Sequence, residues 1–243
     1  MAGTVFTLNP AFFNVMNLAM QGTVQAGKTV VPIPYVNIPD PIQSPFDFNA
    51  QGGVKLLNNA LTSGLYQKPY TVFAWSFGSQ VACKWLREDG PTSAISPNDL
   101  SFILIGNPER HFGGQLGMMR AAADGSGMQS PTWQGGVSTP VSNATAQYVR
   151  SGQLPGIPAG NRYPVIDFAR QYDYYADYPT VPDPNSAATS NASPSIHMNY
   201  FSVTLADTDL ITFGPVNNVT YVWSPTAGGD EQIESAYQRP VTI

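Results

Sequence analysis

The sequence predicts an α/β protein with a mainly parallel central sheet, and three observations lead to this fold class. Two short apolar runs, 70–75 and 100–105, are rich in β-branched and aromatic residues, which is typical of buried strands. Between them, the segment 79–88 carries apolar residues at helical spacing. A strand, a helix and a strand in this order form a βαβ unit with parallel strands. Both runs are apolar on both faces, so we expect helices to cover the sheet.

The same patterns predict the other elements of the chain. Val54, Leu57 and Leu61 lie three and four positions apart and predict a helix over 54–65. The stretch 28–36 is extended but contains two prolines, which restrict it to a sheet edge or a short strand. The remaining expected elements are strands at 3–8, 162–168 and 219–223, a short helix within 12–20, and a helical or extended segment at 199–205.

The length of 243 residues fits one large domain, and no repeat or linker divides the chain. We therefore expect a single domain over 1–243, with an insertion at about 115–160 that is rich in Gly, Ser and Met. Two interpretations of the insertion stay open. It is either a lid whose methionines face lipid, or a surface excursion whose methionines cover the core. A short helix is expected within it, at 141–150.

Composition excludes several classes of function. Only 11% of the residues are charged, against about 25% in typical proteins. The 11 basic residues are scattered and the net charge is −5, so no nucleic-acid partner is expected. Cys83 is the one cysteine, which excludes an intramolecular disulfide. One Cys and two His make a usual metal site improbable, and we expect no metal and no cofactor. The oligomeric state is not predicted.

The beginning of the chain and its hydropathy bear on localisation. The N-terminus lacks the basic region and the long apolar region of a signal peptide. No apolar stretch approaches the roughly 18 residues that a membrane helix requires. We therefore expect a protein that is made in the cytoplasm and has no transmembrane segment. If it acts outside the cell, a route other than a standard signal delivers it.

Ser76 is the strongest candidate for a catalytic residue. It lies between the predicted strand 70–75 and the following helix, with small residues, Ala74 and Gly78, two positions before and after it. This pattern is typical of the nucleophile elbow of α/β-hydrolases, although glycine is usual in the first place. The helix dipole there would favour a developing negative charge. The pattern also fits a serine that only caps the helix.

A serine nucleophile needs a base and an acid. α/β-hydrolases order the triad as serine, acid, histidine, which favours His197 over His111 because candidate acids precede His197. The acid should follow a late strand, and both Asp173 and Asp177 follow the strand predicted at 162–168. We prefer Asp173 because it lies nearer the end of that strand. Asp177 stays the alternative.

These residues predict acyl transfer through a covalent ester. His197 would take the proton of Ser76 and give it to the leaving alcohol, while Asp173 holds the imidazole tautomer. The oxyanion hole needs two donors, and the first is the backbone N–H of Phe77. The second is expected from the loop after the first strand, where the next residue is a proline without an N–H, so we predict Asn9.

Four further motifs follow one another in the chain. They are Gly106-Asn107-Pro108-Glu109-Arg110 with Gly113-Gly114, Gln171-Tyr172-Asp173 to Ala176-Asp177-Tyr178-Pro179, His197 with Asn199-Tyr200, and Val219-Thr220-Tyr221. In this order they resemble the PE-PPE domains of mycobacteria, which are cutinase-like serine hydrolases of the α/β type. The resemblance covers roughly 50–225 and implies the same fold and the same triad. Two departures are the loop around Asn9, where the family usually has a Gly-Thr-Gly-like sequence, and Ala74 in the elbow.

The acid loop Asp173–Ala176 also looks like that of lysin B, the mycobacteriophage esterase. This resemblance implies cleavage of mycolyl-arabinogalactan esters during host lysis. The chain shows neither a signal peptide nor the additional N-terminal module of secreted PE-PPE proteins. We therefore expect a lysin B-like endolysin, made in the host cytoplasm and acting on lipid esters of the mycobacterial cell envelope after release. The alternatives are a PE-PPE-type esterase or lipase for short to medium acyl esters, and a non-catalytic phage structural or cell-wall-binding protein with a hydrolase fold.

Overall fold

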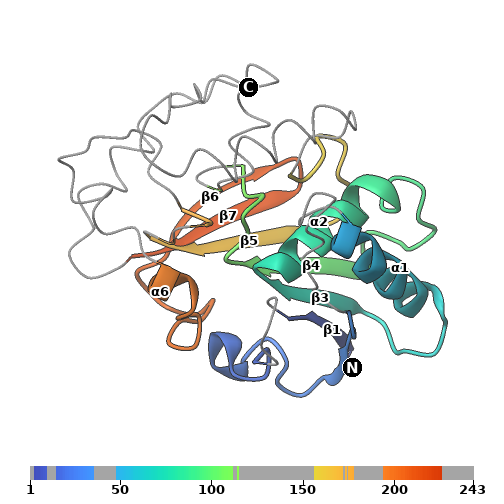
Figure 1. Ribbon diagram of the computed structural model, residues 1–243, viewed down its shortest axis with the longest axis horizontal. Coiled ribbons are helices and arrows are strands. Elements are labelled where there is room, and N and C mark those ends of the chain that lie inside the picture. Colours follow the sequence, from blue (N-terminus) through green and yellow to red (C-terminus); the bar gives the residue numbers. More distant parts are fainter. Residues whose placement is uncertain are drawn as a thin grey trace.

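The described residues form one sheet of seven strands, in the order β2-β1-β3-β4-β5-β7-β6 (Figure 1). The computed structural model describes residues 3–9, 15–35, 48–111, 114, 156–171, 173, 175–177 and 194–225. The strands are β1 (Thr4–Leu8), β2 (Thr29–Pro32), β3 (Tyr70–Trp75), β4 (Leu100–Ile105), β5 (Val165–Arg170), β6 (Ile211–Val216) and β7 (Val219–Ser224).

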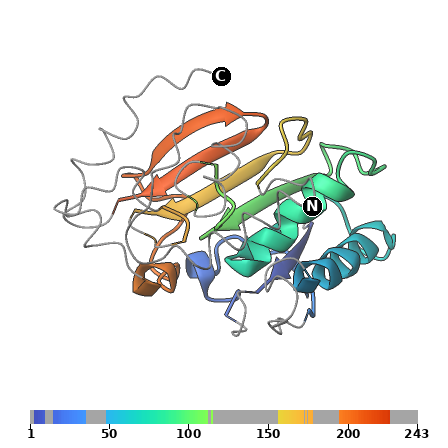
Figure 2. The same cartoon turned by 45° about the horizontal axis from the view of Figure 1, so that its top comes forward.

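Strand direction and helix placement confirm the predicted fold class. Neighbouring strands run parallel except in the β6–β7 pair, which is antiparallel. The helices α1 (Phe48–Thr62) and α2 (Phe77–Glu88) lie side by side on one face of the sheet (Figure 1, Figure 2). This mainly parallel sheet with flanking helices is an α/β-hydrolase-like fold.

Alternation along the strands divides the core into two layers. In β3, Val72 and Ala74 face the layer under α1 and α2, whereas Phe73 and Trp75 face the opposite layer. No long helix of the described chain covers this second layer. Its cover comes from the turns around Met16–Val24 and from the segment that begins at Tyr200. The second layer therefore joins an N-terminal segment to a C-terminal one directly beneath the end of β3.

The stretch 28–36 contributes β2 at the sheet edge, as its prolines predict. Other elements differ from the sequence prediction. Of the helix expected within 12–20, residues 12–14 lie outside the described residues, and 16–18 form a turn that leads into the short 3-10 helix η1 (Ala19–Gly22). The segment 199–205 is irregular. Strand β6 was not predicted, because Gly214 and Pro215 read as a loop. An edge strand tolerates them, since its outer side needs no ladder hydrogen bonds.

The insertion expected at about 115–160 lies between β4 and β5. Apart from 156–160 it falls outside the described residues, and so does the helix expected at 141–150. The strands on either side of it pair directly and in parallel. The chain therefore leaves the sheet after Ile105 and returns to the neighbouring position at Val165. A membrane-spanning helix is not found in the described part of the chain.

Candidate active site

Ser76 sits on a sharp turn between β3 and α2. Its backbone has φ 55° and ψ −115°, a conformation that L-residues rarely adopt and that lifts the side chain out of the sheet. The N–H of Ser76 donates to the carbonyl of Ile105, 3.0 Å away. The side chain of Ser79 donates to the carbonyls of Ala74 and Ile105, at 3.1 and 3.2 Å, and so ties the turn to two strands. The strained conformation is thus held from both sides.

Gly78 is required by a close approach between the turn and β1. A Cβ atom at this position would lie 2.3 Å from the carbonyl oxygen of Leu8, which is shorter than any real contact. The small residue predicted two positions after the serine therefore has a specific steric reason. The approach also brings the end of β1, and with it Asn9, next to the start of α2.

His197 comes to Ser76 from the short helix α6 (Pro194–His197), 121 residues further along the chain. Its Nε2 lies 2.8 Å from the Ser76 Oγ. Its Nδ1 lies 2.9 Å from each carboxylate oxygen of Asp173. Gly106, with φ 55°, allows this placement because a Cβ there would lie 2.9 Å from the His197 ring. The structure thus joins the three predicted residues in one chain of hydrogen bonds.

Asp177, the alternative candidate for the acid, contacts a different part of the molecule. The indole N–H of Trp223 donates to Asp177 Oδ1 at 2.9 Å, so this side chain is engaged with β7 rather than with His197. Asp173 is fully buried and accepts hydrogen bonds from the backbone N–H groups of Tyr175 and Ala176, at 2.8 and 3.2 Å. The geometry separates the two alternatives that sequence spacing left open.

Two tyrosines at the site were not predicted. The ring of Tyr175 lies 4.6 Å from that of His197, centroid to centroid, with an interplanar angle of 59°. The hydroxyl of Tyr200 donates to Asp173 Oδ2 at 2.6 Å. Both residues stand close to predicted site residues in the sequence, two after Asp173 and three after His197. This proximity was the available signal, but it does not say where a side chain points.

The predicted oxyanion donors, Phe77 and Asn9, come from α2 and from the end of β1. Phe77 is the first residue of α2, where backbone N–H groups have no partner within the helix. The hydroxyl of Tyr35 donates to the carbonyl of Asn9, and the Tyr35 ring lies 5.9 Å from that of Phe77. Burial raises the pKa of Tyr35, so the hydroxyl stays a donor. Tyr35 therefore bridges the two backbone segments.

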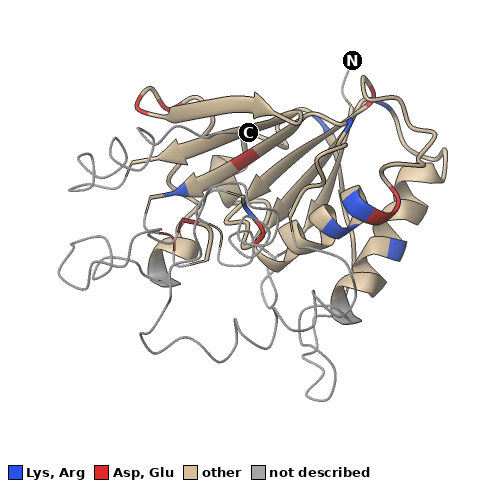
Figure 3. Cartoon of the chain, turned by 90° about the horizontal axis from the view of Figure 1, so that it is seen from above, with Lys and Arg blue, Asp and Glu red and all other residues tan. Residues whose placement is uncertain are grey.

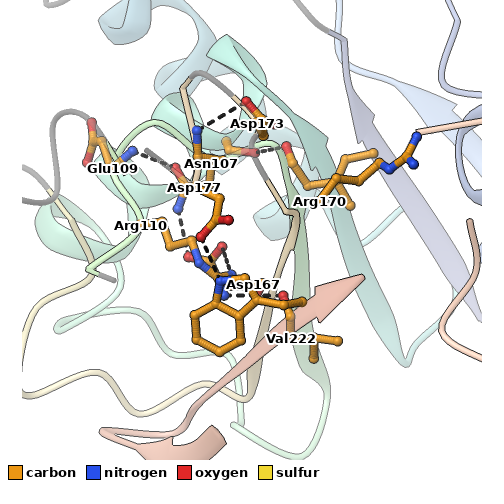
Figure 4. Close-up of polar contacts among 12 residues, drawn as sticks. Asn107, Glu109, Arg110, Asp167, Arg170, Asp173, Asp177 and Val222 are labelled. Atoms are coloured by element: carbon orange, nitrogen blue, oxygen red, sulfur yellow. Dashed lines mark hydrogen bonds and ion pairs between the residues drawn. The ribbon is translucent and has the colours of Figure 1, made fainter. Parts of the chain in front are cut away.

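A second buried polar cluster lies beneath the loop after β4 (Figure 4). The guanidinium of Arg110 lies 3.1 Å from Asp167 Oδ1, donates to the carbonyl of Val222 at 3.2 Å, and stacks 3.9 Å over the Trp223 ring. Asn107 donates to Asp167 Oδ2 at 2.9 Å. Burial raises the pKa of Asp167, and the charge of Arg110 together with these hydrogen bonds opposes that shift.

The described residues contain no group of three or more His, Cys, Asp or Glu side chains that could hold a metal ion. Figure 3 shows charged residues thinly spread over the described elements. The described groups that could carry a reaction are those of the hydrogen-bonded chain from Ser76 through His197 to Asp173.

Comparisons with solved structures find distant likenesses. A cutinase-like protein from Cryptococcus sp. has 18% identity and a TM-score of 0.45, with 82% of this chain and 85% of that chain covered. A lipase-esterase related protein from Clostridium acetobutylicum has 11% identity and a TM-score of 0.40, with 93% and 86% covered. The alpha/beta hydrolase domain-containing protein 10 from mouse has 12% identity and a TM-score of 0.37, with 80% and 79% covered. None carries a functional argument.

Family comparison is more decisive. No curated protein matches the chain. The model of the PE-PPE domain family matches residues 29–224, which include β2 to β7, the elbow at Ser76, and both Asp173 and His197. This match spans most of the chain and contains the four motifs on which the sequence resemblance rests. The chain therefore belongs to the PE-PPE domain family, and its sheet and helices form an α/β-hydrolase-like fold.

Proposed function

We propose that this chain is a serine esterase that hydrolyses acyl esters through a covalent acyl-enzyme. One observation carries the proposal: Ser76 Oγ lies 2.8 Å from His197 Nε2, and His197 Nδ1 lies 2.9 Å from the Asp173 carboxylate. A nucleophile, a base and an orienting acid within hydrogen-bond distance are the arrangement that acyl transfer requires. Membership of the PE-PPE family supports the same reaction class.

In the first half of the reaction, Ser76 Oγ attacks the ester carbonyl carbon. His197 Nε2 takes the hydroxyl proton, and the carbonyl oxygen becomes an oxyanion. When this intermediate collapses, the bond to the alcohol oxygen breaks and His197 returns the proton to the leaving alcohol. In the second half, His197 removes a proton from water, the hydroxide attacks the acyl-enzyme, and the acid is released as Ser76 regains its proton.

Asp173 keeps His197 in the tautomer that this sequence of proton transfers needs. Its carboxylate accepts a hydrogen bond from the Nδ1–H group, which leaves the Nε2 lone pair directed at Ser76. The negative charge also stabilises the imidazolium after proton transfer. Asp173 is buried and makes further hydrogen bonds to backbone N–H groups, so its orientation is set before substrate binds.

The oxyanion is stabilised at the start of α2. The backbone N–H of Phe77 is the first donor, and the N–H of Asn9 is the second. The contact between Gly78 and Leu8 and the hydroxyl of Tyr35 on the Asn9 carbonyl support this assignment, because they hold the two segments together. The positive end of the α2 dipole adds to the stabilisation of negative charge.

Short to medium acyl esters are the substrate class that the family match favours. Cleavage of mycolyl-arabinogalactan esters at the envelope, after release from the producing cell, is the finer alternative. It rests on the likeness of the Asp173–Ala176 sequence to lysin B, and the comparisons give it no support. A non-catalytic binding role is a third reading, which the hydrogen-bonded chain at Ser76 disfavours.

The test is hydrolysis of p-nitrophenyl esters from short to long acyl chains by the parent and by Ser76→Ala. We expect activity in the parent, with a preference for short or medium chains, and its loss in the variant. A fluorophosphonate probe should label the parent on Ser76 and leave the variant unlabelled. Activity that survives Ser76→Ala would refute the proposed nucleophile. A parent that neither reacts with the probe nor hydrolyses any ester, isolated mycobacterial envelope included, would support the binding role.

A further inference from the structure

We propose that Tyr200 is a positioning residue that sets the orientation of Asp173 and the strength of its interaction with His197. This inference rests on the proposed function and goes beyond it, because a serine, a histidine and an acid complete the usual machinery. The chain of hydrogen bonds does not end at Asp173. It continues through the Tyr200 hydroxyl to the backbone at the end of β5.

The hydroxyl of Tyr200 makes one hydrogen bond as a donor and one as an acceptor. It donates to Asp173 Oδ2 at 2.6 Å and accepts from the backbone N–H of Arg170 at 3.1 Å. The backbone N–H of Arg170 donates a hydrogen bond to the hydroxyl oxygen. The hydroxyl's own proton therefore points at the Asp173 carboxylate. A hydroxyl donating to a carboxylate at this distance is a charge-assisted hydrogen bond, about twice as strong as a neutral one.

The two oxygens of Asp173 are held by different groups. Oδ1 accepts from the backbone N–H groups of Tyr175 and Ala176, whereas Oδ2 accepts from Tyr200. His197 Nδ1 lies 2.9 Å from both oxygens. The terminal torsion of a carboxylate is broad, so contacts to one oxygen alone would let it rotate. Tyr200 fixes the second oxygen and thereby the plane in which the carboxylate meets the imidazole.

The ring of Tyr200 is anchored to the strands that carry the other site residues. It lies 5.6 Å from the ring of Trp75, which precedes Ser76, and 6.1 Å from that of Phe168 in β5, which leads to Asp173. Tyr200 itself is fully buried. A single side chain therefore contacts the strand before the nucleophile, the strand before the acid, and the acid itself.

The backbone of Tyr200 is held by a strained turn from the other end of the chain. Met20 donates its N–H to the carbonyl of Tyr200 at 2.7 Å, and the side chain of Gln21 donates to the carbonyl of Ser202 at 3.2 Å. Met20 and Gln21 have φ of 51° and 55°, a left-handed conformation that non-glycine residues rarely adopt. Such strain persists where surrounding contacts impose it and is found at functional sites. This turn precedes residue 29, where the family match begins.

The surrounding charges keep Tyr200 a donor. Burial raises the pKa of Tyr200, and the negative charge and hydrogen bond of Asp173 raise it further. The hydrogen bond from the Arg170 backbone and the positive charge of Arg110 oppose this shift. The guanidinium of Arg170 is directed to the carbonyl of Asn199, at 2.8 Å. Among the described residues, His197 also faces the ring of Tyr200, and the two ring centroids lie 6.4 Å apart. Tyr200 therefore donates a hydrogen bond over the whole working pH range.

The test compares Tyr200→Phe with a matched control, Tyr163→Phe. Both tyrosines are fully buried, but the Tyr163 hydroxyl donates to the backbone carbonyl of Ile95, at 3.1 Å, away from the site. We expect Tyr200→Phe to lower kcat about tenfold at little change in KM, because one hydrogen bond to a charged group corresponds to roughly one decade in rate. The acidic limb of the pH profile of kcat/KM should move to higher pH. Without the hydroxyl, the undiminished charge of Asp173 holds the protonated base more strongly.

A second readout does not depend on turnover. The proton between His197 Nδ1 and Asp173 gives a far-downfield resonance in the proton NMR spectrum, and Tyr200→Phe should shift it. Tyr163→Phe should leave both the resonance and the pH profile unchanged. Fluorotyrosine at position 200 retains the bond with a more acidic hydroxyl, so it should move both readouts opposite to Tyr200→Phe. This third variant also keeps the test available if Tyr200→Phe does not fold.

Failure of this inference is distinguishable from failure of the proposed function. If the parent hydrolyses esters and Tyr200→Phe matches Tyr163→Phe in pH profile and resonance, Tyr200 has only a structural role and the inference is overturned. If the parent hydrolyses nothing but the resonance shifts only with changes at position 200, the positioning role stands and the proposed function fails. Absence of the resonance in the parent would contradict the hydrogen-bonded chain itself.

Discussion

Asp167 and Asp173 are two fully buried carboxylates that lie six positions apart, and they serve different ends. Asp167 lies within β5 and contacts Arg110 and Asn107. Asp173 lies just beyond β5 and contacts His197 and Tyr200. The first carboxylate has a guanidinium as its partner, which is always charged, whereas the second has the imidazole that serves as the base in the proposed mechanism. Burial is therefore not what separates a structural acid from a reactive one.

Position along the strand explains the difference. Asp167 is paired in register with Leu104 of β4 and Tyr221 of β7, so it lies inside the sheet. Asp173 lies past the carboxyl end of β5, on the side where Ser76 leaves β3. Loops of several parallel strands meet at this edge, and ligands of open α/β sheets bind there. Asp167 thus links neighbouring strands, while Asp173 faces a partner delivered by a distant loop.

The largest effect that would test this contrast is the loss of activity in Asp173→Asn. The amide would donate to His197 Nδ1, which moves the ring proton to Nε2 and prevents His197 from accepting the proton of Ser76. We expect kcat to fall about 10⁴-fold, with little change in the urea midpoint because an amide fills the same space. The measurement is ester hydrolysis beside equilibrium unfolding. Nearly full activity would show that Asp173 does not orient the base.

Asp167→Asn should act in the opposite way and comes next in size. The substitution removes the carboxylate that the buried Arg110 guanidinium contacts. We expect a loss of about 3–5 kcal/mol in the free energy of unfolding, because breaking a buried ion pair leaves an uncompensated charge. Urea unfolding measures it, and kcat of the remaining folded protein should stay near the parent value.

An exposed ion pair is the control for Asp167→Asn. Lys68 Nζ lies 2.9 Å from Asp99 Oδ2, but these side chains are 50% and 36% exposed. Solvent screens such a pair, so Lys68→Met should leave the urea midpoint within experimental error. If Lys68→Met and Asp167→Asn were equally mild, burial of the Arg110 cluster would not contribute to stability as we argue.

Apart from the Lys68→Met control, the smallest of these effects should come from Gly78→Ala, which sharpens the comparison on the side of the active site. A Cβ at position 78 would lie 2.3 Å from the Leu8 carbonyl, so the end of β1 and Asn9 must move away from Phe77. Losing one oxyanion donor costs about 10²-fold in kcat, which is the drop that we expect. Gly52→Ala in α1 is the matched control, since its Cβ would meet nothing within 4 Å. An unchanged kcat in Gly78→Ala would exclude Asn9 as a donor.

The main elements could be predicted because their signals are local. The apolar runs at 70–75 and 100–105 and the periodic apolar residues of 79–88 require only the sequence window around them, and the fold class follows from their order. Strand β6 escaped prediction since Gly214 and Pro215 are normal in loops, and only its place at the sheet edge makes them acceptable in a strand. In the described part of 12–20, apolar residues cover the second core layer from turns and a short 3-10 helix. Their apolar character alone therefore did not identify the local structure.

The sequence was enough to select Ser76 and His197 as candidates. α/β-hydrolases keep the order serine, acid, histidine, and the elbow between β3 and α2 has a local sequence pattern. The sequence did not separate Asp173 from Asp177, since both follow β5 and differ in the direction of their side chains. Tertiary structure decided it by bringing Trp223 to one carboxylate and His197 and Tyr200 to the other. A hydrogen bond needs atoms within about 3 Å of each other. Contacts between residues far apart in sequence satisfy that condition only once the sheet and its loops have formed.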